Sequence, residues 1–109
     1  MTLLVERAHQ IVEDLSRARS RRAFLAALEH FERVIAMAPD YPRGCLNEQD
    51  VQTLGALADT VIGHIEERLD HHTDRMPVQR TLAAGIYQIR QDVETVYSAV
   101  RESAVPALK

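Results

Sequence analysis

Four stretches of the chain carry apolar residues at intervals of three and four positions, the spacing of one face of an α-helix. They predict helices over residues 3–18, 21–38, 48–72 and 76–104. The last is the most regular, because steps of four and three alternate through Leu82, Ile86, Ile89, Val93, Val96 and Val100. Each helix alone would be marginal in water, so the apolar faces must pack against one another. The pattern predicts an all-α single domain over residues 1–109, folded as an antiparallel up-down four-helix bundle.

Polar residues mark several helix boundaries. Ser20 is the predicted N-cap of the second helix. No Gly or Pro forces a break before it, so residues 1–38 form either two helices joined by a tight turn or one bent helix. Asn47, with Asp50 three residues later, predicts a capping box at the start of the third helix. Pro77 falls in the first turn of the fourth helix, where proline is tolerated.

Residues 27–41 combine a small residue at Ala27, an aromatic at Phe31, a branched residue at Val34 and a proline at Pro39. This stretch resembles the second helix of a tetratricopeptide repeat. The resemblance implies peptide-binding helical hairpins, and such hairpins are the alternative fold. A second repeat does not follow at the ~34-residue period of that family.

Composition supports one folded domain. The chain has 109 residues, of which 46% are hydrophobic and 27% charged. Its net charge of −3 gives no general attraction to nucleic acid or to an anionic membrane, so neither is an expected partner. The single cysteine, Cys45, excludes an internal disulfide, and no signal-peptide or membrane-spanning run is present, so we expect a cytoplasmic protein. Lys109 is the only lysine beside twelve arginines, a bias typical of a GC-rich, bacterial coding sequence.

A stripe of possible metal ligands lies near the end of the third helix. His64, Glu67, His71 and Asp74 are three, four and three residues apart. Imidazole and carboxylate groups at this spacing can bind a first-row transition metal, the one cofactor that the sequence suggests. The stripe points away from the apolar seam of its helix, so the alternative interpretation is a solvated charged face.

The chain contains one cluster of basic residues: Arg17, Arg19, Arg21 and Arg22. It predicts a patch for an acidic partner or a phosphate-bearing ligand. No aromatic residues are interleaved, which argues against nucleic acid. Packing beside the acidic third helix, or simple solvation, is the alternative.

Catalytic signatures are missing from the sequence. It has no Ser/His/Asp, Cys/His, phosphate-loop, dinucleotide or paired zinc-cysteine motif, which favours a non-enzymatic protein. His30 invites comparison with phosphotransfer histidines, but the adjacent Glu29 and nearby Glu32 would repel phosphate. We interpret it as a surface histidine.

The fourth predicted helix is longer than the first can cover. At 1.5 Å per residue, ~27 residues extend ~40 Å, against ~24 Å for ~16 residues. The excess predicts an interaction surface that includes Leu82, Ile89, Val93, Val96, Tyr97 and Val100. The leading hypothesis is therefore a protein–protein interaction or self-association module of adaptor, chaperone or regulator type, with a homodimer as the expected oligomer. The alternative is a metal- or small-ligand-binding bundle that uses the third-helix stripe.

Overall fold

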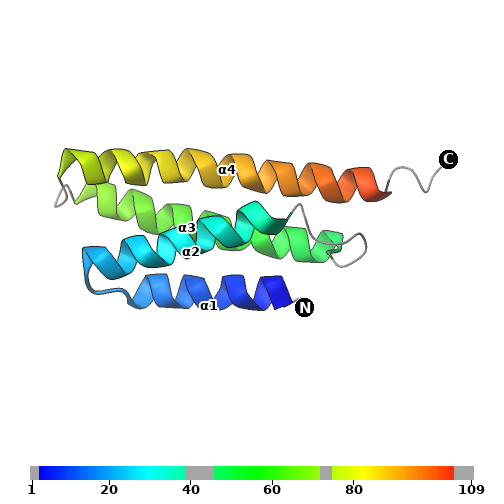
Figure 1. Cartoon of the computed structure of the whole chain (residues 1–109), viewed down its shortest axis with the longest axis horizontal. Helices are drawn as coiled ribbons and strands as arrows, with labels where there is room; N and C mark the ends of the chain where they lie inside the picture. The colour runs from blue at the N-terminus through cyan, green and yellow to red at the C-terminus, as the bar shows by residue number, and fades with distance from the viewer. Residues whose placement is uncertain (1–2, 39–45, 72–74, 105–109) are drawn as a thin grey trace.

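The computed structural model describes residues 3–38, 46–71 and 75–104, with side chains as far as residue 101. It contains four α-helices and, within those ranges, no strand. The helices are α1 (Leu3–Arg17), α2 (Arg21–Met37), α3 (Glu48–Asp70) and α4 (Met76–Ala104). They lie along one long axis and reverse direction at each connection (Figure 1). The predicted all-α, up-down four-helix bundle is confirmed.

Local capping explains where two of the helices begin. The Ser20 hydroxyl accepts a hydrogen bond from the Ala23 N–H at 3.1 Å, so α1 and α2 are separate helices rather than one bent helix. At the start of α3, the Asn47 side chain accepts from the Asp50 N–H at 2.8 Å. The Asp50 carboxylate in turn accepts from the Asn47 N–H at 3.2 Å, which completes the predicted capping box. Pro77 is the second residue of α4, as expected.

The four helices form two antiparallel hairpins that pack side by side. α1 contacts α2 and α3 contacts α4 within the hairpins, while α1 lies beside α3 and α2 beside α4 between them. α2 and α3 therefore lie across a diagonal of the bundle from each other and make few contacts. One continuous core forms between the hairpins instead of the stacked hairpins of a tetratricopeptide array.

Buried apolar side chains from all four helices make this core. The largest fully buried ones are Phe31, Leu15, Ile35, Leu54, Ile65, Leu82 and Ile89. α4 contributes Leu82, Ile89 and Val96, which recur every seventh residue and so stay on one face of the helix. No helix in the described ranges is long and apolar enough to cross a lipid bilayer.

The helices differ in length, and this shapes the molecule. α3 has 23 residues and α4 has 29, against 15 for α1 and 17 for α2. The second hairpin therefore extends past the first, most visibly at the C-terminal end of α4 (Figure 1). Along that end, α4 packs on the first half of α3. A Cβ atom added to Gly55 of α3 would lie 3.3 Å from the Tyr97 hydroxyl of α4.

Candidate functional site

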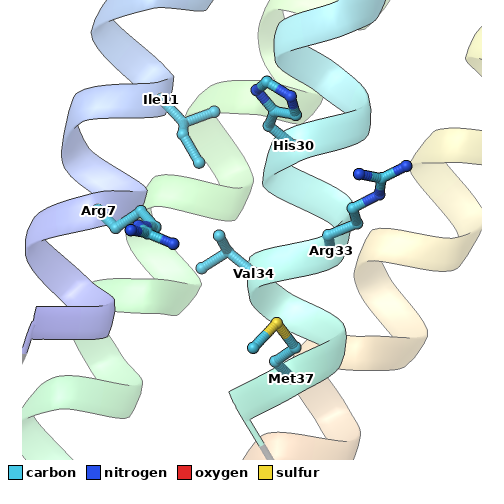
Figure 2. Close-up of a pocket in the computed structure, with 6 residues that line it drawn as sticks. All are labelled: Arg7, Ile11, His30, Arg33, Val34 and Met37. Atoms are coloured by element: carbon cyan, nitrogen blue, oxygen red, sulfur yellow. The ribbon is translucent and has the colours of Figure 1, made fainter.

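A groove of about 390 Å³ runs between α1 and α2 on the outside of the bundle. Its lining residues are Arg7 and Ile11 of α1, and His30, Arg33, Val34 and Met37 of α2. Figure 2 shows them on facing turns of the two helices. Arg7 and Ile11 are four positions apart on α1, so they share one face of that helix. On α2, His30, Val34 and Met37 share a face in the same way, and Arg33 lies at its edge. The antiparallel hairpin then brings the two faces together.

The floor of this groove is apolar. Ile11 and Val34 form it and are themselves part of the core, so they are rigidly held. Met37 continues it at the end of α2, where 57% of its surface is exposed. Leu3, one helical turn from Arg7, is 70% exposed at the same end of the hairpin. Met37 thus gives the groove one large apolar side chain in contact with solvent, and Leu3 is a second exposed apolar side chain at this end of the hairpin.

Cationic side chains border the groove. Arg7 extends from α1 toward Val34, and Arg33 points away from it along the outer side of α2 (Figure 2). Arg33 donates a hydrogen bond to the Glu29 carboxylate at 2.6 Å, in an ion pair whose two side chains are mostly exposed. Arg7 has no ion pair or hydrogen bond with another side chain of the described ranges. His30 lines the groove one turn before Val34.

Sequence reasoning placed His30 on the surface but missed this groove. The signal was present: Arg7 and Ile11 are four residues apart, and His30, Val34 and Met37 follow at four and three. When two helices are joined by a tight turn, their apolar faces pack together. Cationic residues beside both faces then indicate a groove with a basic border. Which edges meet depends on how each helix is rotated about its axis, and local sequence does not fix that rotation.

A second hollow of about 490 Å³ lies where the α1–α2 turn meets α3. Leu15, Ser16, Ala18 and Phe24 line it from the first hairpin, and His64, Glu67, Arg68 and His71 from α3. The Arg68 guanidinium lies over the Phe24 ring, 4.9 Å from its centroid, and closes part of the hollow. Three of the four predicted metal ligands therefore border one cavity.

The geometry of the three described ligands can be compared with that of a metal site. One ring nitrogen of His71, Nδ1, lies 2.7 Å from the Glu67 backbone carbonyl and is taken up by that contact. Among the described residues, no group of three or more His, Cys, Asp or Glu side chains is placed to hold a metal ion. Asp74, the fourth predicted ligand, lies outside those residues.

The predicted basic patch lies at the α1–α2 turn. Arg17, Arg19, Arg21 and Arg22 are all exposed there. In the described part of the chain, Arg17, Arg19 and Arg22 form no ion pair with the acidic α3. The patch lies beside the Ser20 cap, at the opposite end of the hairpin from Met37, and its role with an anionic partner stays a prediction.

The predicted interaction surface on α4 is divided by the fold. Leu82, Ile89 and Val96 are buried in the core of the bundle. Val93, Tyr97 and Val100 are half-buried against that core and keep part of their surface exposed. The part of α4 that extends past α1 packs on α3 at least as far as Tyr97, which lies against Gly55.

Glu32 is a partly buried acidic side chain with other carboxylates nearby. Burial raises the pKa of Glu32, and the nearby carboxylates of Asp92 and Glu29 raise it further. Glu32 lies in the contact between α2 and α4, near the buried Gly85. Asp92 accepts a hydrogen bond from Gln88 at 3.0 Å, one turn earlier on α4.

No protein-family model, curated protein or solved structure matches this chain. Function is therefore argued from the geometry of the chain itself.

Proposed function

We propose that this chain is a non-enzymatic interaction module that binds a helical segment of another protein in the α1–α2 groove. The observation that carries the proposal is the apolar floor of Ile11 and Val34, which continues to Met37, a side chain that is 57% exposed. Binding of a partner would remove this apolar surface from water, and that burial favours association.

The groove is a better docking surface than α4. Leu82, Ile89 and Val96 are buried in the core, so these side chains cannot contact a partner unless the bundle unfolds. Val93, Tyr97 and Val100 are half-buried, whereas Met37 at the end of the groove is 57% exposed. Tyr87, 67% exposed on the side of α4 that faces away from the core, provides a comparison with Met37 at a separate place on the molecule.

The shape of the groove fits a helix. Its lining on α2 runs from His30 to Met37, which are seven positions apart, or about 10 Å at 1.5 Å per residue. Two turns of a partner helix cover that length and present side chains at positions i, i+3 and i+7. The groove lies between two helices, so a third helix can pack there by the same ridge-and-groove geometry that forms the bundle.

The charges favour a different protein over a second copy of this chain. A symmetric dimer that joins two such grooves would bring Arg7 and Arg33 of both copies to the same interface. Like charges brought together destabilise an interface. The homodimer expected from the sequence thus becomes the competing outcome of the test.

Two matched variants test this function. Met37→Gln removes an exposed apolar side chain from the groove, and Tyr87→Gln removes one from α4. Each tagged variant and the wild type would be used to capture proteins from native lysate, with quantitative mass spectrometry. Captured partners would then be purified for binding measurements with each variant.

We expect a partner whose affinity falls about tenfold or more with Met37→Gln and is unchanged with Tyr87→Gln. A partner sensitive to Tyr87→Gln alone would move the interaction to α4 and overturn the proposal. Analytical ultracentrifugation of the purified wild type and of Met37→Gln would measure the oligomeric state. A wild-type dimer that dissociates in Met37→Gln would assign the groove to self-association and overturn the proposal of a different partner.

A further inference from the structure

Resting on the proposed function, we infer the chemistry of the partner: an amphipathic helix whose apolar ridge is flanked by aspartate or glutamate. The α1–α2 groove combines an apolar floor with a cationic border, and a ligand must satisfy both. Arg7, Arg33 and His30 supply that border, and no acidic side chain lines the groove among the described residues.

Arg7 is the strongest recognition element. It reaches over the groove beside Val34, and it has no acidic partner among the described side chains (Figure 2). Its guanidinium group can donate two parallel hydrogen bonds to one carboxylate. A partner carboxylate there would meet a cation that needs to break no existing ion pair.

Arg33 plays a weaker part. Its pair with Glu29 is exposed on both sides, at 68% and 61%, and exposed ion pairs contribute little to stability. A partner carboxylate could therefore share Arg33 at small cost. However, Arg33 points along the outer side of α2, so it sits at the rim of the interface and contributes mainly to long-range attraction (Figure 2).

These positions specify a pattern in the partner. Apolar side chains at i, i+3 and i+7 would occupy the floor between His30 and Met37. An acidic residue on the α1 side of this ridge would face Arg7, and a second on the α2 side would face His30 or Arg33. The pattern is that of an acidic amphipathic helix two to three turns long. The acidic residues beside its apolar ridge would be attracted to the cationic border of the groove, which accelerates association.

The test is a display library of helical peptides with an apolar ridge at i, i+3 and i+7 and random residues at the flanking positions. The library is selected for binding to the full chain, and binders that still bind Met37→Gln are removed. Flanks rich in Asp and Glu among the survivors are the expected result. Survivors with neutral or basic flanks would overturn the acidic specificity and leave the proposed function standing. A library with no Met37-dependent survivor would overturn both.

A charge-reversal experiment then assigns the specificity to one side chain. Arg7→Glu reverses the charge of the groove cation that has no acidic partner among the described side chains. Arg22→Glu makes the same charge change in the exposed patch at the far end of the hairpin. We expect Arg7→Glu to weaken an acidic selected peptide at least tenfold and to strengthen a version with lysine flanks. Arg22→Glu should change either affinity by less than about threefold. Equal losses in the two variants would show general charge attraction and contradict a role for the groove.

Discussion

A Cβ atom placed on Gly85 of α4 would lie 3.0 Å from the Oε1 atom of Glu32 on α2. The Leu28 side chain would be 3.6 Å from the same point. Gly85 is buried, so its lack of a side chain is what allows α2 to bring Leu28 and a carboxylate this close to α4. The contact links the packing of the two hairpins to the charge of Glu32.

Substitution of two glycines by alanine separates helix propensity from this contact. Nothing lies within 4 Å of a Cβ atom on Gly63, which is exposed in α3. Gly63→Ala should therefore raise the free energy of unfolding by about 1 kcal/mol, the difference in helix propensity. Gly85→Ala should gain less than half as much, because the Glu32 carboxylate must move aside. Urea unfolding of both variants measures the difference, and equal gains would show that the α2–α4 contact imposes no constraint.

The charge of Glu32 should make the bundle less stable as pH rises. Its pKa in the folded chain is raised above the ordinary value of 4.5 by burial and by Asp92 and Glu29. The folded state therefore binds this proton more tightly than the unfolded state, and the associated stability is lost as pH rises from about 4.5 through the folded pKa. Glu32→Gln should be more stable than the wild type at pH 7, and the advantage should shrink as pH falls toward 4.

Thermal or urea unfolding of both proteins across pH 4 to 7 checks this, because the protonation of Glu32 changes the free energy of unfolding within this range. Glu66→Gln removes the same charge from an exposed site on α3 and serves as the control for net charge. A constant difference between Glu32→Gln and the wild type over this range would contradict the assigned environment of Glu32.

The capping box of α3 should contribute measurably to stability. Asn47→Ala removes the acceptor of the Asp50 N–H and should lower the free energy of unfolding by about 1 kcal/mol. Thr60→Ala removes a hydroxyl bonded to the Ala56 carbonyl on an exposed turn of the same helix. It should leave the free energy of unfolding unchanged or raise it slightly, because alanine has the higher helix propensity. Similar losses in the two variants would mean that the cap contributes nothing specific to the start of α3.

The seam of α4 should behave as core and not as an interface. Val96 is 2% exposed, so Val96→Ala should cost about 2 kcal/mol of unfolding free energy in the isolated chain. Val93→Ala, on the half-buried side of the same helix, should cost less than half of that. Chemical denaturation measures both. If Val96→Ala left stability unchanged and altered only an association equilibrium, the placement of α4 would be incorrect.

The sequence by itself determined the number of helices, most of their limits and the alternation of their directions. These features depend on residues close together in the chain: the periodic apolar positions, the Ser20 cap and the Asn47–Asp50 box. The physical cause is local, since a capping side chain satisfies backbone groups within three residues and a helical face repeats every few residues.

The tertiary structure alone decided which surfaces remain exposed. Periodicity marks one apolar face on α4 but does not say that α3 covers it as far as Tyr97, or that α2 and α3 lie on a diagonal. It likewise does not reveal that Arg7 and Val34 meet across a groove. These outcomes depend on the rotation and neighbours of each helix, which are set by the packing of all four apolar faces together and therefore cannot be read from any one of them.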